Sequence, residues 1–260
     1  MKIALVGYGK MGLMLRNAAE SCGHEVVVTI DVANKAADVI VPVGDGKAVA
    51  EAVKNSGAEG VIEFTHPTAV MENIKNLLPL GIPLVVGTTG WNDKFAEVEA
   101  LAKECNGVIL AGGNFSVGVN LLYKIIAEAQ RLISSYPEYD TAVWEMHHTQ
   151  KADSPSGTAL EIAKVILENN PLKNEIVTDE FKQKPEKNQL HVSSTRCGNV
   201  PGTHSVFFDG PADTIEIKHT ARSREGFAYG AVHGLEKIAA GLKDGSLERG
   251  RFYKMSEMFQ

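Results

Sequence analysis

Cysteine is scarce in this chain, and long apolar runs are absent from it. The 260 residues include three cysteines, Cys22, Cys105 and Cys197, which lie far apart and form no CxxC pair. Scattered thiols argue against a disulfide framework and favour a reducing, cytoplasmic compartment. No basic leader with an apolar core opens the sequence, and no run approaches a membrane span, so we expect neither a secretion signal nor a membrane partner.

Positive charge is also in short supply. The 26 Lys and Arg residues are outnumbered by 32 Asp and Glu, for a formal net charge of -6. This balance argues against a general nucleic-acid partner, although it leaves room for a local basic pocket. His, Cys, Asp and Glu do not cluster along the chain with metal-ligand spacing, and we therefore expect no metal. Hydrophobic residues, at 44%, are numerous enough for a real core.

The first half of the chain alternates short apolar runs with amphipathic segments. The runs predict strands at 2–6, 26–30, 60–64, 83–86 and 108–111. The segments between them predict helices at 11–22, 48–55, 68–78 and 93–105. Strands separated by helices imply parallel βαβ units, so we expect an α/β fold that begins with a Rossmann-type, doubly wound parallel sheet.

After about residue 114 the pattern changes. Helices are predicted at 117–133, from 156–158 to 167, and at 227–242, and a strand at 141–146. Residues 168–189 are polar with little periodicity and are expected to form a surface excursion. Three strand-like runs then follow closely, at 190–195, 203–208 and 214–218. Strands without intervening helices indicate a mixed or antiparallel sheet, and hence a C-terminal α+β domain with a mixed open sheet.

A G-x-G-x-x-G turn, formed by Gly7, Gly9 and Gly12, directly follows the first predicted strand. The first glycine permits a tight turn, the second lets the backbone approach a pyrophosphate, and the third lets the helix lie close to the strand. Asp31 ends the second strand, where an acidic residue takes the adenosine ribose hydroxyls. We expect NADH, NADPH or both as cofactor, with NADH slightly favoured because Asp31 would repel a 2′-phosphate. Lys35 could soften that preference.

Two further turns follow strands at the edge where a doubly wound sheet places its ligand. They are 87–90 and 112–116, whose small residues would let the backbone approach a nicotinamide ring and its ribose. The 63–67 segment ends another strand and could wall the same crevice, with His66 a turn residue rather than a catalyst. The residues predicted to bind the cofactor are Gly7, Tyr8, Gly9, Lys10, Met11, Gly12, Asp31, Gly87, Thr88, Thr89, Gly112, Gly113, Asn114 and Phe115.

The most informative segment is 147–158, His-His-Thr-Gln-Lys-Ala-Asp-Ser-Pro-Ser-Gly-Thr. Thr158 and Glu161 fit a capping box, which predicts that a helix opens at 156–158. The free N–H groups and positive end of such a helix suit a carboxylate or phosphate. Lys151 adds positive charge, and the histidines can donate protons near neutral pH. A well-capped polar loop would be the simpler interpretation, but the convergence of these groups favours a site that binds an anion and protonates it.

Together these segments resemble the dihydrodipicolinate reductase (4-hydroxy-tetrahydrodipicolinate reductase) family. The resemblance spans nearly the whole chain and is carried by G-T-T-G at 87–90, N-F-S-V-G-V-N at 114–120, E-x-H-H-x-x-K-x-D-x-P-S-G-T-A at 145–159, R-x-G-x-x-x-G-x-H at 196–204 and I-E-I-x-H-x-A-x-S-R-x-x-F-A-x-G-A at 215–231. Ser154 departs from the family's alanine, Glu63 from its aspartate and Lys10 from its arginine. The glycine turn is also one residue shorter than in many members, which leaves the cofactor preference open.

The resemblance implies hydride transfer from NADH or NADPH to 4-hydroxy-tetrahydrodipicolinate, a small dicarboxylate, in diaminopimelate and lysine biosynthesis. The products would be tetrahydrodipicolinate and water. It also implies a dinucleotide-binding domain over 1–115, completed by the C-terminal segment from about 225 to 260. Residues 116–224 would then form a substrate-binding and oligomerisation domain whose sheets assemble a homotetramer.

By motif position, His147 is expected to donate or accept the catalytic proton, and Lys151 to be a second donor and a clamp on the substrate. His148, Gly157 and Thr158 are expected to hold the substrate carboxylate, the last two through backbone N–H groups. Other residues are secondary or unassigned. Arg224 and Phe227 are secondary cofactor candidates, Asp153 is expected to organise the loop, His204 and His219 fit structural roles, and Arg196 could face the substrate or form a structural ion pair.

Two other functions fit parts of the sequence. Another amino-acid-linked NAD(P) dehydrogenase would share the glycine turn but should lack the His-His, Lys and Ser-Gly-Thr motif. A nucleotide-sensing regulator would need a DNA-binding or partner module, and no basic helix-turn-helix segment is present. The motif in the second half therefore favours the reductase.

Overall fold

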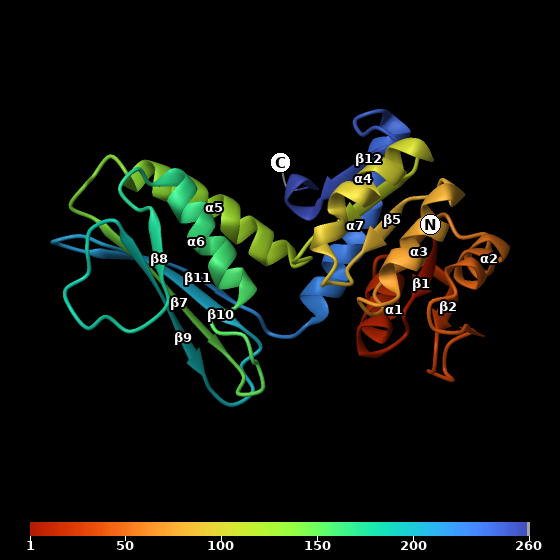
Figure 1. Cartoon of the computed structure of the whole chain (residues 1–260), viewed down its shortest axis with the longest axis horizontal. Helices are drawn as coiled ribbons and strands as arrows, with labels where there is room; N and C mark the ends of the chain where they lie inside the picture. The colour runs from red at the N-terminus through yellow and green to blue at the C-terminus, as the bar shows by residue number, and fades with distance from the viewer. Residues whose placement is uncertain (259–260) are drawn as a thin grey trace. The chain divides into compact units, whose positions relative to one another are not determined.

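Parallel strands form the sheet of the first of two structural units, which comprises Met1–Val117 and Glu225–Gln260 (Figure 1). In the computed structural model, which describes residues 1–258, this sheet has seven strands in the order β12-β6-β5-β4-β1-β2-β3. The strands are β1 (Lys2–Val6), β2 (Glu25–Asp31), β3 (Val39–Ile40), β4 (Gly60–Glu63), β5 (Leu84–Val86), β6 (Val108–Ala111) and β12 (Arg251–Lys254). Every pairing between them is parallel.

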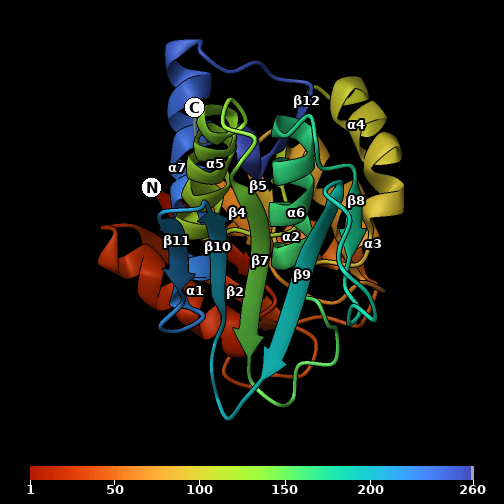
Figure 2. The same cartoon turned by 90° about the vertical axis from the view of Figure 1, so that its left-hand side faces the viewer.

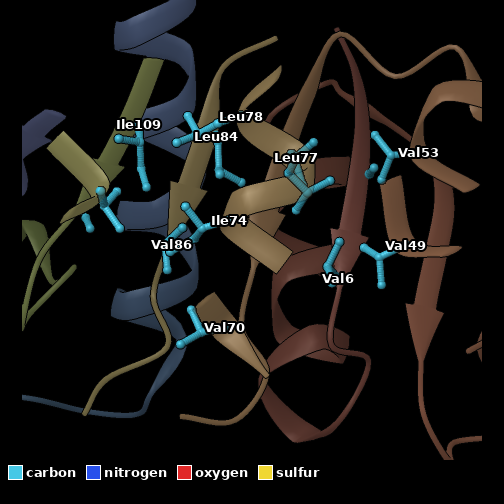
Figure 3. Packing of buried hydrophobic residues seen from close by; sticks show 14 of the residues in the cluster. Val6, Val49, Val53, Val70, Ile74, Leu77, Leu78, Leu84, Val86 and Ile109 are labelled. Carbon is cyan, nitrogen blue, oxygen red and sulfur yellow. The ribbon is translucent and has the colours of Figure 1, made fainter. Parts of the chain in front are cut away.

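Helices cover both faces of this sheet because its strands are apolar on both sides. The helices of this unit are α1 (Lys10–Ser21), α2 (Gly46–Ser56), α3 (Val70–Leu77), α4 (Phe95–Glu104) and α7 (Glu225–Asp244). Alternate residues of β1 enter opposite cores: Ala4 and Val6 pack with α2, α3 and α4, whereas Ile3 and Leu5 pack with α1 and α7. Figure 3 shows the first of these cores. The doubly wound sheet expected from the alternating pattern is confirmed.

Strand β1 is the point at which the order of the sheet reverses. Its neighbours are β2 on one side and β4 on the other, and the chain crosses from β3 back past β1 to reach β4. In open α/β sheets, ligands bind beyond the carboxyl ends of the strands at such a switch point. The turns after Val6 and Glu63 therefore meet at the edge where a nucleotide is expected.

The C-terminal segment returns to this first unit. Helix α7 packs beside α1, and β12 adds an edge strand to β6, with Arg251 opposite Val108 and Lys254 opposite Ala111. A Cβ atom at Gly230 would lie 1.6 Å from the carbonyl oxygen of Phe115, so the glycine is what lets α7 approach so closely. The sequence pattern predicted a helix at 227–242 but no strand at 251–254.

The second unit, Gly118–Arg224, carries a mixed sheet. Its five strands, all within the described residues, lie in the order β11-β10-β7-β9-β8. Their bounds are β7 (Asp140–His147), β8 (Glu175–Val177), β9 (Gln189–Arg196), β10 (Thr203–Asp209) and β11 (Thr214–Thr220). Strand β10 is antiparallel to β7 and β11, whereas β7, β9 and β8 are parallel. The mixed α+β sheet is confirmed, and β8 lies within the 168–189 segment that was predicted to be a surface excursion.

Two helices, α5 (Val117–Ile133) and α6 (Gly157–Asn169), pack on one face of the mixed sheet (Figure 2). Leu122 and Ile126 of α5 and Ile162 of α6 contact a core built from alternate residues of the strands, such as Val143 and Phe208. In the part of the chain described here, no helix of either unit is long and apolar enough to cross a membrane.

Candidate active site

In the glycine turn after β1, two of the three glycines face nearby backbone atoms, and the third faces open space. Gly7 has φ +91°, and a Cβ atom there would lie 2.0 Å from the carbonyl oxygen of Phe64. At Gly12 a Cβ atom would lie 2.4 Å from the carbonyl oxygen of Gly7. Around Gly9, by contrast, a Cβ atom would meet nothing within 4 Å. The first and third glycines therefore serve packing, and the second leaves space into which a ligand could fit.

Asp31 is tied to the glycine turn by hydrogen bonds. Its carboxylate accepts from the backbone N–H of Tyr8 at 2.7 Å and from those of Ala33 and Asn34 at 2.9 Å. Burial opposes ionisation, but these hydrogen bonds outweigh it and lower the pKa of Asp31, so the side chain is anionic at neutral pH. Tyr8 buries its ring and Lys10 is exposed. Asp31 thus both shapes the turn and carries charge beside it.

Glu63, at the end of β4, is a buried residue of the 63–67 segment that was predicted to wall the nucleotide crevice. Its carboxyl group accepts from the hydroxyl of Thr65, from Thr88 Oγ1 at 2.7 Å and from Asn73 Nδ2 at 3.1 Å. Burial raises its pKa despite these hydrogen bonds. Thr65 N–H also donates to Thr88 Oγ1 at 2.7 Å. This network joins the ends of β4 and β5, so the side chain of Thr88 is directed inward.

The remaining predicted cofactor residues fall into two groups. Gly87 and Gly112 face protein atoms, since Cβ atoms there would lie 1.9 Å from the Phe64 ring and 2.8 Å from Met255 Cβ. Phe115 is 3% exposed and packs its ring against Phe64. The second group is more accessible. Thr89, Gly113 and Arg224 are exposed, Met11, Asn114 and Phe227 are half-buried, and nothing lies within 4 Å of a Cβ atom built at Gly113.

In the second unit, strand β7 places Glu145 and His147 on the face covered by α5 and α6. The Glu145 carboxylate is fully buried and accepts from His147 Nδ1 and, at 2.8 Å, from Arg196 Nη1. Burial opposes its ionisation, but the hydrogen bonds outweigh that effect and lower the pKa of Glu145. Glu145 belongs to the 145–159 motif, but the sequence pattern predicted no role for it. A carboxylate two residues before a strand-end histidine was the signal available.

His147 is held so that one ring nitrogen is left for chemistry. Burial lowers its pKa and the Glu145 carboxylate only partly offsets this, so the ring is neutral at neutral pH. With the proton on Nδ1 facing Glu145, Nε2 carries the lone pair. A Cβ atom at Gly202, which has φ +151°, would lie 2.9 Å from that Nε2. Gly202 therefore keeps the reactive edge of the imidazole clear.

His204 packs against His147 from strand β10. The two ring centroids are 5.1 Å apart at an interplanar angle of 73°, and His204 Nε2 hydrogen-bonds with Ser156 Oγ at 3.2 Å. Burial, with His147 next in importance, lowers the pKa of His204 to about 4. His219 lies opposite His204 in the adjacent strand, and burial lowers its pKa as well. These histidines are neutral, and His204 packs beside His147 on the same face of the sheet.

Arg196 forms a structural ion pair, which answers the question that the sequence left open. Besides Glu145, its guanidinium donates to the backbone carbonyls of Asp153 at 2.5 Å and of Lys151 at 3.3 Å. It lies opposite His147 in the parallel pairing of β7 and β9. Arg196 therefore fixes the 151–153 loop to the buried carboxylate that orients His147.

Lys151 and the start of α6 form the cationic part of the site. Lys151 Nζ lies 2.8 Å from Asp153 Oδ1. This ammonium lowers the pKa of Asp153, and the backbone N–H of Gly157 contributes in the same direction. A Cβ atom at Gly157 would meet nothing within 4 Å. The Asp153 carboxylate thus interacts with the two kinds of donor, ammonium and helix N–H, that were predicted to bind a substrate carboxylate.

The helix opens where it was predicted, but the expected capping box is wrong. Ser156 is the N-cap and its hydroxyl accepts from the N–H of Ala159 at 3.2 Å. Glu161 instead pairs with Lys164 at 2.6 Å. The Thr158 hydroxyl interacts with the hydroxyl of Tyr123 in α5. Burial raises the pKa of Tyr123 to about 12. Ser156 outcompetes Thr158 because its extended backbone aligns the hydroxyl with the orphan N–H groups of the first turn.

The predicted substrate residues lie in one segment of the second unit. His147 ends β7, half-buried His148 follows it and accepts at its carbonyl from the N–H of Lys151 at 3.1 Å, and the 151–158 loop leads into α6. An oriented imidazole, an ammonium and a helix N-terminus can together bind an anion and exchange a proton with it. The structure identifies Glu145, His204 and Gly202 as further parts of this assembly.

Comparison with known proteins agrees with these features. A model of the N-terminal part of dihydrodipicolinate reductase matches residues 1–115, and one of its C-terminal part matches residues 118–259. Proteins named 4-hydroxy-tetrahydrodipicolinate reductase from Christiangramia forsetii and Archaeoglobus fulgidus are 34% and 33% identical. The first alignment covers 92% of each chain and the second covers 100% of each.

Solved structures share the fold. A dipicolinate-bound dihydrodipicolinate reductase from Paenisporosarcina sp. TG-14 superimposes with a TM-score of 0.77 at 20% identity, over 99% of this chain and 98% of that one. A myo-inositol dehydrogenase from Corynebacterium glutamicum gives a TM-score of 0.53 at 15% identity, over 94% and 89% of the two chains. The same architecture is therefore shared by proteins named for different substrates, so the fold alone does not specify the substrate of this chain.

Proposed function

Because the chain belongs to the dihydrodipicolinate reductase family, we propose that it reduces 4-hydroxy-tetrahydrodipicolinate to tetrahydrodipicolinate with NADH or NADPH. The nucleotide, when bound, supplies a hydride to the substrate. The substrate hydroxyl is lost and combines with one proton from the medium to form water. We assign nucleotide binding to the first unit, and substrate binding and oligomerisation to the second. The observation that carries the proposal is the Glu145–His147 pair beside Lys151 and the N-terminus of α6.

The substrate is a dicarboxylate, and the second unit offers donors suited to it. Lys151 would form a charge-assisted hydrogen bond with one carboxylate, roughly twice as strong as a neutral one. The N–H groups of Gly157 and Thr158, in the first turn of α6, would bind the same group with help from the helix dipole. Asp153 now neutralises Lys151, so the incoming carboxylate must displace it. His148 completes the set as a half-buried imidazole.

The proton chemistry is assigned to His147, with Lys151 as the second donor. Glu145 holds the Nδ1–H of His147, which leaves Nε2 to carry a proton to or from the substrate. Because the buried Glu145 is anionic, it stabilises the imidazolium whenever Nε2 is protonated. Arg196 balances the charge of Glu145 and keeps it from becoming protonated itself.

The first unit fits a dinucleotide. The open space at Gly9 and the free N-terminus of α1 suit the pyrophosphate, and Thr89 and Gly113 offer accessible backbone at the neighbouring strand ends. We propose that anionic Asp31 takes the adenosine ribose hydroxyls and gives a modest preference for NADH. Lys10, in the glycine turn, and Lys35, four residues after Asp31, are both exposed, and their positive charge would weaken that preference by attracting a 2′-phosphate.

We also propose a homotetramer built through the mixed sheet, in a cytoplasmic enzyme without a metal in its reaction. Helices α5 and α6 cover one face of the sheet, and Figure 2 looks onto the other. The latter face carries Trp144, Met146 and Phe207, large apolar residues that alternate with those of the core. A Trp144→Glu variant that sediments as a smaller species than the wild type would support this; an unchanged species would contradict it.

The decisive experiment is oxidation of NADH and of NADPH, each measured separately, with freshly generated 4-hydroxy-tetrahydrodipicolinate. We expect turnover with both nucleotides and competitive inhibition by pyridine-2,6-dicarboxylate, a planar mimic of the substrate. Absence of turnover with either nucleotide would refute the proposed reaction. Turnover with other amino-acid-derived substrates at comparable kcat/KM would point to a related dehydrogenase instead.

A further inference from the structure

A second cluster of metal-binding residue types lies in the first unit, at the C-terminal end of α1. Cys22 is the C-cap of this helix and His24 follows it, while His233 and Glu236 are one turn apart on α7. The ligand atoms of Cys22, His233 and Glu236 all lie within 4.8 Å of one another. None of these residues belongs to the nucleotide edge or to the His147 site.

A shared carboxylate organises the cluster. Glu236 contacts His24 Nε2 with one oxygen and His233 Nδ1 with the other, both at 2.7 Å. Both imidazoles thus direct a nitrogen toward the same group, and Cys22 brings a sulfur into the same space. The group of ligand atoms within 4.8 Å of one another comprises Cys22, His233 and Glu236, so His24, which contacts Glu236 at 2.7 Å, would have to move toward the other two to become the fourth ligand.

The surrounding core holds the two helices in fixed register. Leu15, Ala18 and Ala19 of α1 and Ala231 and Leu235 of α7 are buried in one apolar cluster. Small residues at this contact allow the helices to lie close together, which brings the end of α1 to the middle of α7. The positions of His233 and Glu236 are therefore set by a packed core, and Cys22 and His24 lie in the turn that directly follows α1.

We propose that Cys22, His24, His233 and Glu236 bind a single zinc ion. One sulfur, two nitrogens and one carboxylate oxygen form a set that Zn²⁺ accepts in tetrahedral geometry. Binding would release the Cys22 thiol proton to solvent and leave both imidazoles neutral. The ion would be structural, since four protein ligands leave no open position, and it would clamp the C-terminal helix to the first βα unit.

Glu236 supplies negative charge within the cluster, and the Met1 ammonium lies 3.2 Å from His24 Nδ1, the ring nitrogen that does not face Glu236. In the metal-free protein, burial and then the negative charge of Glu236 raise the pKa of the Cys22 thiol. A divalent ion would replace this repulsion with attraction to both groups. The other group of metal-ligand types, Glu145, His147 and His204, is less suited because Arg196 already lies 2.8 Å from Glu145. The ligand positions in sequence gave no hint of this site, since folding joins residues more than 200 positions apart.

Cobalt(II) binding to the chelator-treated, full-length protein tests the proposal directly. We expect one Co²⁺ per chain with a thiolate-to-cobalt charge-transfer band and intense tetrahedral d–d bands. The charge-transfer band should vanish in Cys22→Ser and persist in Cys105→Ser, which is a matched control because Cys105 is likewise the half-buried C-cap of a helix. Loss of one ligand should weaken binding at least about tenfold.

Thermal unfolding supplies a second readout that does not depend on turnover. Zn²⁺ should raise the midpoint for the wild type and for His66→Gln, an exposed histidine outside the cluster, but not for His233→Gln. The proposal is overturned if no charge-transfer band forms, if the band survives in Cys22→Ser, or if His204→Gln abolishes cobalt binding. If no charge-transfer band forms, His24 and His233 only form hydrogen bonds with Glu236. Reductase activity plays no part in either measurement.

Discussion

His147 and Glu145 project from the same face of strand β7, and the imidazole Nδ1 hydrogen-bonds to a carboxylate that is wholly buried. The pairing follows from strand geometry, because residues two apart share a face. It fixes the tautomer of the ring, which in turn decides which nitrogen can serve the substrate. Arg196 holds the other carboxylate oxygen at 2.8 Å, so the geometry is maintained from both sides.

Replacing His147 with glutamine should lower kcat by about 10²–10⁴-fold, the range for loss of a general acid or base. Glu145→Gln should also lower kcat, and it should shift the pH profile. Because the Glu145 carboxylate raises the pKa of His147 against the effect of burial, its removal should move the limb of the kcat profile that reports His147 to lower pH, whether that residue acts as acid or base. Steady-state kinetics across pH would measure both effects. Nucleotide affinity should barely change, and its collapse in His147→Gln would argue against this assignment.

Lys151→Ala should raise KM for the substrate and lower kcat together. The lost ammonium removes a charge-assisted contact, so binding of pyridine-2,6-dicarboxylate should weaken by roughly 10–100-fold. Asp153→Asn should act in the opposite direction on the inhibitor, because it frees Lys151 from a carboxylate 2.8 Å away. Calorimetric titration compares the two. The control is Lys164→Ala, which removes an exposed lysine of α6. If Lys151→Ala keeps near-normal inhibitor affinity, the helix N-terminus alone binds the carboxylate and the role given to Lys151 is wrong.

Asp31→Asn should shift cofactor preference toward NADPH. The amide keeps an acceptor for the N–H of Tyr8 and so preserves the turn, but it removes the charge that would repel a 2′-phosphate. We expect the ratio of kcat/KM for NADPH to that for NADH to rise by roughly tenfold. An unchanged ratio with intact NADH binding would mean that Asp31 only shapes the turn. Asp31→Ala, which also loses the hydrogen-bond acceptor for Tyr8, should weaken the binding of both NADH and NADPH.

The second unit should lose stability as the pH falls from about 6.5 toward 4. The pKa of His204 lies at about 4 in the folded chain against an ordinary value of 6.5, so the unfolded chain binds the proton first. Stability from this residue is complete above pH 6.5 and declines below it, by up to about 3 kcal/mol. His204→Gln should flatten the dependence of the unfolding midpoint on pH, and exposed His66→Gln should not. His147 and His219 act in the same direction, so some slope should persist.

The local pattern of apolar and polar residues was sufficient to predict the main helices and strands of both units. The apolar runs of β1, β2 and β4 and the turn at Gly7, Gly9 and Gly12 identify parallel βαβ units, because both faces of such strands are buried. The 145–159 motif likewise indicated the family, which the comparisons bear out. The individual roles given to its residues are still predictions.

Short edge strands could not be recognised in the same way. β3, β8 and β12 have two, three and four residues, and each pairs at the border of a sheet. Such segments become strands because a neighbouring strand offers its free N–H and C=O groups, which is a property of the partner rather than of the segment. The capping of α6 by Ser156 instead of Thr158 depended similarly on backbone angles that only the folded loop has.

Residue types and their local spacing were therefore enough to establish the two kinds of sheet and the glycine turn, and to single out the segment that is predicted to bind an anion. Only the tertiary structure determined that Arg196 pairs with Glu145, that His204 packs edge-on against His147, and that Cys22 lies near His233 and Glu236. The physical reason is that hydrophobic periodicity and turn chemistry act between near neighbours in the chain. Ion pairs, ring contacts and coordination clusters depend instead on which distant strands and helices the core brings together.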